Sequence, residues 1–69
     1  MEEIKWPKLT LSVAEAAKVL GVSVSKMYQI VRIQGFPTLV IGSKLLVSAK
    51  GLERWVEEKA KQGWSHNQT

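Results

Sequence analysis

Apolar residues near the start of the chain recur at spacings of three and four, which is the spacing of one face of an α-helix. The first such face consists of Val13, Ala16, Ala17 and Leu20. Ser12 precedes this face and Glu15 follows three residues later, the capping-box pattern that marks a helix start. Gly21 stands where a helix ends in the left-handed conformation. The pattern therefore predicts a first helix between Ser12 and Gly21.

A second helical stripe follows almost at once. It consists of Met27, Ile30, Val31 and Gln34. Ser23 is placed to cap this helix, Gly35 is expected to end it, and only Gly21 and Val22 separate it from the first. Val22 is expected to point from the turn into the core. Two short helices joined by a tight turn form a helix-turn-helix, the unit that many proteins use to place one helix in the DNA major groove.

Beyond the second helix the pattern changes to that of strands. Thr38–Ile41 and Leu45–Val47 are β-rich runs that flank Gly42-Ser43-Lys44, and they predict a hairpin with glycine in the turn. Ser48 is expected to cap a third helix that ends near Gly63. The buried stripe of this helix is expected to consist of Leu52, Trp55 and Val56. The order predicts a mainly α fold with a small β-hairpin, a winged helix-turn-helix.

The length of 69 residues allows one domain, which at this size buries only about 60% of the surface that the unfolded chain exposes. We expect an N-terminal arm over residues 1–9, the winged helix-turn-helix domain over residues 10–64 and a disordered tail over residues 65–69. The chain has no cysteine and one histidine, His66, which alone forms neither a metal site nor a catalytic triad. We therefore expect no catalytic activity, no cofactor and no metal.

The apolar runs are too short to span a membrane, and the first residues do not read as a secretion signal. These features predict a cytoplasmic protein. The net charge is +4, and its distribution is uneven. Residues 8–54 hold seven bases against two acids, giving +5, whereas residues 1–7 carry −1 and residues 55–69 balance to zero. This distribution is typical of a protein with a polyanionic partner, but also of many small soluble proteins.

The outer side of the second helix carries candidate DNA contacts. With the apolar stripe turned inward, the opposite side consists of Ser25, Gln29 and Arg32, flanked by Lys26 and Tyr28. No acid occurs between Ser23 and Gln34, where a carboxylate would repel phosphate. Gln can bind the N6 and N7 edge of adenine and Arg the O6 and N7 edge of guanine, each worth about 1–3 kcal/mol of base discrimination. We therefore expect Gln29 and Arg32 to read bases.

The other candidates on this helix are expected to contact the DNA backbone. Ser23, Ser25 and the free N–H groups at the helix start suit phosphate, the Tyr28 hydroxyl can do the same, and Lys26 supplies charge. Lys44, at the hairpin tip, is expected to reach a phosphate. Structural alternatives stay open: Ser23 as a cap only, Tyr28 as a ring at the core edge, and the two base-reading candidates as solvated side chains.

Three motifs resemble a known family. They are LSVAEAAKVLGVS-x-S-x-x-Y-x-x-V over residues 11–31, P-x-x-V-I-G-x-K over residues 37–44 and L-x-x-W-V over residues 52–56. Over roughly residues 10–57 the chain resembles the excisionase family of small helix-turn-helix proteins, related to the DNA-binding domain of MerR regulators and to AlpA-type prophage regulators. The resemblance implies a second helix in the major groove and a wing on adjacent backbone or minor groove. It also implies a prokaryotic, nucleoid-associated protein. Carried over by position, it marks Ser25, Lys26, Tyr28, Gln29 and Arg32 for the groove, and Ser43 and Lys44 for the wing.

The chain departs from this family in its wing. The family wing often carries several arginines, whereas residues 40–48 read VIGSKLLVS and keep only Lys44, and Val24 stands where a base is frequent. Each lost phosphate contact removes roughly 0.9 from the salt slope of log K, so we expect a lone monomer to bind weakly. Both strands are apolar on both faces, so Val40 or Leu46 is expected to expose apolar surface that a protein partner or a second copy covers.

Two hypotheses follow from the sequence. The first is a non-enzymatic, sequence-specific protein that binds double-stranded DNA, either as an excision factor for a mobile element or as a small transcription regulator. Its expected partners are DNA, an integrase or recombinase, RNA polymerase, and a second copy bound on DNA. The second hypothesis is a protein-interaction adaptor on a winged-helix scaffold, favoured by the apolar wing and the sparse bases. The acid-free polar side of the second helix distinguishes them, because an adaptor does not require it.

Overall fold

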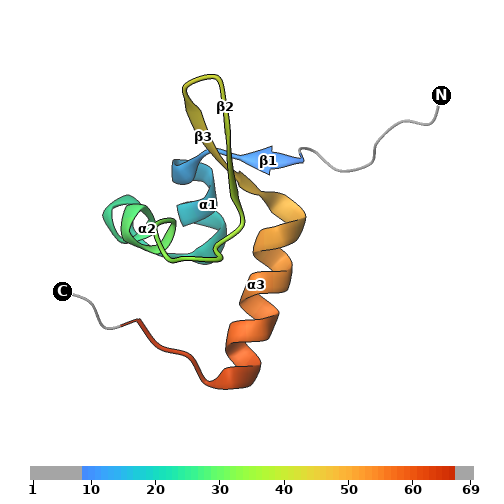
Figure 1. Ribbon diagram of the computed structural model, residues 1–69. Helices are drawn as coiled ribbons and strands as arrows, with labels where there is room; N and C mark the ends of the chain where they lie inside the picture. Colours follow the sequence, from blue (N-terminus) through green and yellow to red (C-terminus); the bar gives the residue numbers. More distant parts are fainter. Residues whose placement is uncertain (1–8, 67–69) are drawn as a thin grey trace.

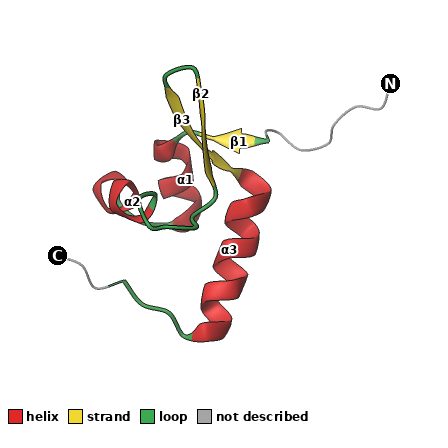
Figure 2. Cartoon of the chain, viewed as in Figure 1, coloured by secondary structure: helices red, strands yellow, loops and turns green. Residues whose placement is uncertain are grey.

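The computed structural model describes residues 9–66, in which three helices gather at the base of a small antiparallel sheet (Figure 1). Along the chain the elements are β1 (Thr10–Leu11), α1 (Val13–Leu20), α2 (Val24–Ile30), β2 (Thr38–Ile41), β3 (Lys44–Ser48) and α3 (Ala49–Gln62). This order confirms the predicted mainly α fold with a hairpin wing (Figure 2). The predicted arm and tail fall largely on residues 1–8 and 67–69, which lie outside the described residues.

The helices begin and end where local chemistry predicts. Ser12 Oγ accepts a hydrogen bond from the Glu15 N–H at 3.1 Å, and Glu15 Oε1 accepts one from the Ser12 N–H at 2.9 Å, so the capping box is confirmed. Ser48 Oγ accepts from the Gly51 N–H at 2.9 Å at the start of α3. Gly21 ends α1 with φ 79°, a left-handed conformation that a Cβ would disfavour.

The predicted extent of α2 was wrong, because the helix ends at Ile30, about one turn early. The following backbone bonds join residues three apart: the Arg32 N–H donates to the Gln29 carbonyl at 3.2 Å, and the Ile33 N–H to the Ile30 carbonyl at 3.0 Å. Gln34, predicted to face the core, is exposed.

Tertiary packing explains the early end of α2. Ile33 packs against the core although it lies off the helical stripe, and Phe36 is buried at 6% exposure. The Phe36 N–H donates to the Ile33 carbonyl at 3.0 Å, which holds the chain in a tight turn. β-branched residues such as Val31 and Ile33 have weak helix propensity, so burying these side chains prevails over continuing the helix.

The sheet has three strands in the order β1-β3-β2, one more than the predicted hairpin. Thr10 pairs with Ser48 and Leu11 with Val47, so β1 extends the hairpin on the β3 side. Two residues are too few to show the alternation that identifies a strand in a sequence. The predicted hairpin itself is confirmed, but its turn has two residues instead of three, because Lys44 pairs with Ile41 and begins β3.

The core lies between α1, α2, the first turns of α3 and the base of the hairpin. Its buried members are Val13, Ala16, Ala17, Met27, Ile30, Phe36, Val47 and Leu52. Val22 packs against this cluster, as predicted. Trp55 is half-buried and meets Phe36 edge-on, with 4.8 Å between ring centroids. The prediction that Val56 is buried was wrong, since it is 38% exposed. The second half of α3 extends past the other elements, which leaves Val56 only partly covered (Figure 2).

Candidate nucleic-acid interface

α2 divides into a buried face and an exposed face. Met27 and Ile30 are buried, at 0% and 6% exposure. Ser25 and Gln29 are exposed, and Tyr28 is half exposed at 50%. The predicted separation of core and outer side chains on this helix is therefore confirmed.

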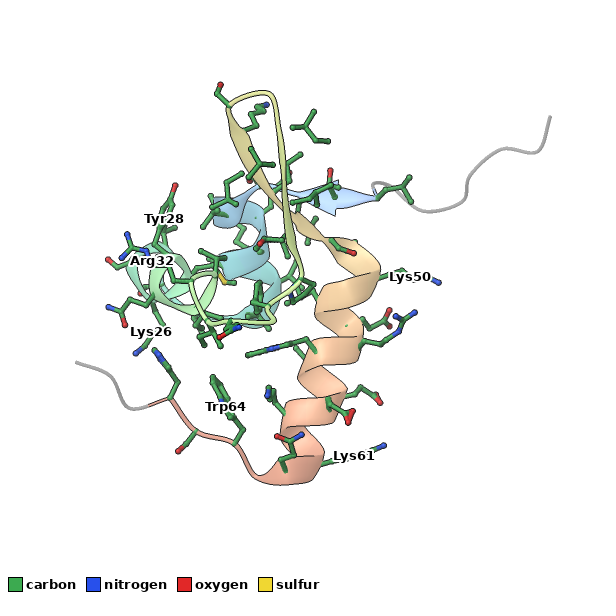
Figure 3. All side chains as sticks on the ribbon, viewed as in Figure 1. Lys26, Tyr28, Arg32, Lys50, Lys61 and Trp64 are labelled. Atoms are coloured by element: carbon green, nitrogen blue, oxygen red, sulfur yellow. The ribbon has the colours of Figure 1, made fainter. Side chains whose placement is uncertain are left out.

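Arg32 is exposed, as predicted, but it does not lie on α2. It sits in the turn after the helix, because α2 ends before the residue that would continue its outer face. The side chain still extends from the same side of the molecule as Lys26 and Tyr28 (Figure 3). The predicted continuous stripe on one helix was therefore wrong. Ser25 and Gln29 lie on α2, and the Arg32 guanidinium extends from the turn that follows it.

Ser23 acts as the cap of α2. Its Oγ accepts a hydrogen bond from the Lys26 N–H at 3.1 Å, while its backbone is extended with φ −72° and ψ 158°. The cap was one of the alternatives left open by the sequence, and the structure shows it. A phosphate contact by Ser23 stays a prediction.

Lys26 lies at the edge of the outer face and is half-buried. Its Nζ is 3.5 Å from Gln29 Oε1 on the next turn and 3.5 Å from His66 Nδ1. His66 in turn stacks on Trp64, with 5.7 Å between centroids and 16° between the rings. We predicted no role for His66 from the sequence. In the structure, however, the chain beyond α3 returns to Lys26, a candidate DNA-contact residue. Lys26 and His66 lie 40 positions apart, so no local sequence pattern predicts their contact. Only the aromatic character of Trp64 suggests that the chain folds back here.

Ser43 and Lys44 lie at the tip of the hairpin and are exposed. Gly42 adopts φ 66° in the turn, which allows the two strands to reverse over two residues. The hairpin projects beyond the helices, so its tip is accessible to a large ligand (Figure 1).

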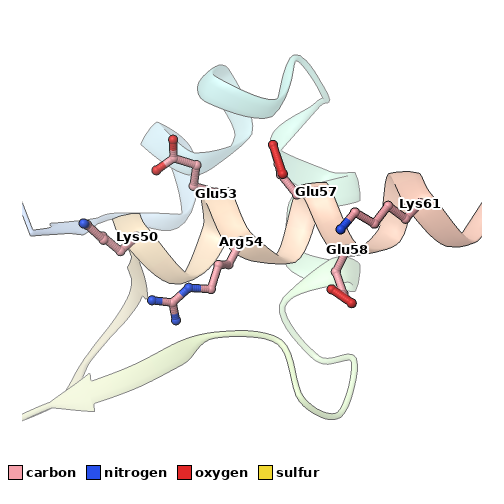
Figure 4. A pocket seen from close by; sticks show the side chains of 6 residues that line it. All are labelled: Lys50, Glu53, Arg54, Glu57, Glu58 and Lys61. Carbon is pink, nitrogen blue, oxygen red and sulfur yellow. The ribbon is translucent and has the colours of Figure 1, made fainter.

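The charges of the molecule are segregated along the chain. Between residues 16 and 52 there is no acid, whereas Lys18, Lys26, Arg32, Lys44 and Lys50 supply five bases. The exposed side of α3, in contrast, mixes both signs. Its charged residues are Lys50, Glu53, Arg54, Glu57, Glu58 and Lys61 (Figure 4). Lys50 and Lys61 extend from α3 on the side away from α2 (Figure 3). A polyanion therefore meets no carboxylate on α2 or the wing but meets three on α3.

Residues 9–66 contain no cluster of three or more histidine, cysteine or acidic side chains able to hold a metal ion. Among these residues, no helix has the length and apolar character needed to cross a membrane.

Comparison with protein families matches residues 10–60 to the family described as helix-turn-helix domain. Comparisons with curated proteins and with solved structures gave no significant match. The matched segment runs from β1 into the last turns of α3 and so includes both helices of the motif and the wing. The chain therefore belongs to the helix-turn-helix domain family of small DNA-binding proteins.

Proposed function

We propose that this protein is a non-enzymatic, sequence-specific binder of double-stranded DNA, with α2 in the major groove and the β2–β3 hairpin on the adjacent backbone. The observation that carries the proposal is the exposed, acid-free side of α2, formed by Ser25, Tyr28 and Gln29, in a chain of the helix-turn-helix family. A helix that merely faces solvent usually carries acidic and basic side chains together, as α3 does.

The side chains have distinct proposed roles. Gln29 and Arg32 read base edges: the Gln29 amide can accept from N6 and donate to N7 of adenine, and the Arg32 guanidinium can donate to both O6 and N7 of guanine. The backbone contacts are assigned to Ser23, Ser25, Lys26, Tyr28, Ser43 and Lys44. Phosphate contacts of this kind fix the register on the duplex but carry no sequence information of their own.

In the cell, the proposed role is that of an excision factor acting with an integrase or recombinase, or of a small transcription regulator acting with RNA polymerase. The resemblance to excisionase-like and MerR-like proteins supports both roles equally. In either role the proposed action is to occupy DNA, bend it or contact a neighbouring protein, in the prokaryotic cytoplasm.

A selection from random duplex DNA tests the proposal. The protein is titrated at several salt concentrations, and retained duplexes are sequenced. We expect a recovered motif, with affinity falling steeply as salt rises. Gln29→Ala should lose about 1–3 kcal/mol on the recovered site and relax one base position. Gln62→Ala, an exposed glutamine at the end of α3, is the matched control and should change neither.

The adaptor remains the second candidate because the hairpin exposes aliphatic side chains, notably Val40 at 65% and Ile41 at 59%. No retention of DNA even at low salt would favour the adaptor and contradict the DNA-binding proposal. Equal losses for Gln29→Ala and Gln62→Ala would contradict base reading by Gln29.

A further inference from the structure

β2 is an edge strand with an unguarded outer edge. β3 pairs with it on one side, and no strand pairs with its other side among the described residues. Proteins usually protect such edges with charged residues, proline or bulges. The strand reads Thr-Leu-Val-Ile, with none of these devices within it.

The hairpin register shows which backbone groups point outward. In a two-residue hairpin the closing pair, here Ile41 and Lys44, exchanges hydrogen bonds, and hydrogen-bonded pairs then alternate along the ladder. The Ser48 N–H donates to the Pro37 carbonyl at 3.0 Å. Pro37 lies four positions before Ile41, an even number, so this bond agrees with the alternation of hydrogen-bonded pairs. Val40 lies between hydrogen-bonded pairs, so its N–H and C=O point away from β3.

The side chains around this edge are aliphatic on both faces of the sheet. Leu39 is 37% exposed, Val40 65%, Ile41 59% and Leu45 37%. Leu46, in contrast, is half-buried. Leu39 and Ile41 share one face, and Val40 shares the other with Leu45, because side chains alternate along a strand and directly paired residues share a face.

We propose that β2 is a self-association surface on which a second copy of this chain adds its own β2, antiparallel, about a two-fold axis at Val40. Each Val40 N–H then donates to the Val40 carbonyl of the other copy, and the two three-stranded sheets become one of six strands. This inference goes beyond DNA binding, and its test needs no DNA.

The pairing is self-complementary in side chains as well as backbone. In this register Leu39 of each copy faces Ile41 of the other, twice on one face, and the two Val40 side chains meet on the opposite face beside Leu45. Aliphatic cross-strand pairs of this kind stabilise sheets. No ionisable group lies on β2, so forming the contact desolvates no charge on the pairing strands. These features favour a second copy over a charged partner.

The contact area sets the expected strength. Four strand residues per copy cover much less than the roughly 800 Å² per partner of a standard stable interface. The dimer is therefore weak and reversible in solution. Two copies held on neighbouring DNA sites experience a far higher effective concentration, at which a contact of this size becomes significant.

Disulfide trapping tests the register, since the chain has no cysteine of its own. Leu39→Cys and Ile41→Cys variants are incubated separately and as an equal mixture in a glutathione redox buffer. The proposed pairing places residue 39 of one copy opposite residue 41 of the other, about 4.5 Å apart between Cα atoms, at the short end of the range that disulfides span. Cross-linking in the mixture should exceed that of either variant alone by about tenfold, because oriented groups react faster than freely diffusing ones.

Val19→Cys controls for exposure, because Val19 on α1 is as exposed as Val40. Mixing Val19→Cys with either Leu39→Cys or Ile41→Cys should not raise cross-linking above that of the separate variants. Val40→Pro provides an independent test. It removes the outward N–H and the Val40 side-chain contact but no bond to β3, a change that edge strands tolerate, and it should abolish concentration-dependent dimerisation in sedimentation equilibrium. Equal cross-linking in the mixture and in the separate variants would overturn the proposal, as would a wild-type chain that stays monomeric at millimolar concentration. DNA selection by the wild type reports separately on the proposed function.

Discussion

Replacing Met27 by alanine tests how firmly the candidate DNA-reading helix is anchored. Met27 has 0% exposure and is one of the two largest fully buried side chains described. Truncating a buried methionine to alanine costs about 2–5 kcal/mol, through lost transfer free energy and the cavity that remains. A domain of this length has a total stability of about 3–10 kcal/mol. The substitution should therefore remove a large share of the free energy of unfolding.

Urea unfolding, followed by tryptophan fluorescence, measures this loss. With a slope near 1 kcal/mol per molar urea for so small a domain, the midpoint should fall by about 2 M or more. Val24→Ala is the control, because Val24 lies on the same helix at 45% exposure and should change stability by about 0.5 kcal/mol at most. A Met27→Ala protein no less stable than Val24→Ala would refute the burial argument. α2 has only seven residues, so it depends on this anchor to form at all.

Three further predictions concern the caps, the wing and the α3 junction. Ser12→Ala should lower stability by about 1 kcal/mol, because it removes the hydroxyl that accepts from the Glu15 amide; an unchanged melting temperature would contradict this. Gly51→Ala should destabilise by about 1–3 kcal/mol, since its new Cβ would lie 2.6 Å from the Pro37 Cβ, and thermal unfolding would detect it; full stability would show that the loop yields freely. Lys44→Ala should lower the salt slope of DNA binding by about one, whereas Lys61→Ala should not, and equal slopes would contradict a phosphate contact at the wing.

The features that the sequence predicts well are those set by neighbouring residues. The caps at Ser12, Ser23 and Ser48 each bond an amide only three positions away, so their signal survives without tertiary information. The hairpin is similarly local, because the turn at Gly42 fixes its register.

The features that the sequence misses are set by distant packing. The end of α2 depends on burial of Phe36, which draws Ile33 into a turn instead of another helical step. Arg32 is displaced from the helix for the same reason. The approach of His66 to Lys26 joins residues 40 positions apart in the chain, and no spacing rule anticipates it.

The return of the chain from α3 to α2 also bears on how the protein is handled. His66 is the last described residue, and its ring lies beside Lys26 at the rim of the proposed DNA face. β1, in contrast, enters on the side away from α2 (Figure 1). A purification tag or fluorophore added on the C-terminal side would thus follow a segment that already lies beside the surface proposed to meet the duplex. A label joined directly to the start of β1 would lie away from that surface, so the two labelled forms should differ in measured DNA affinity.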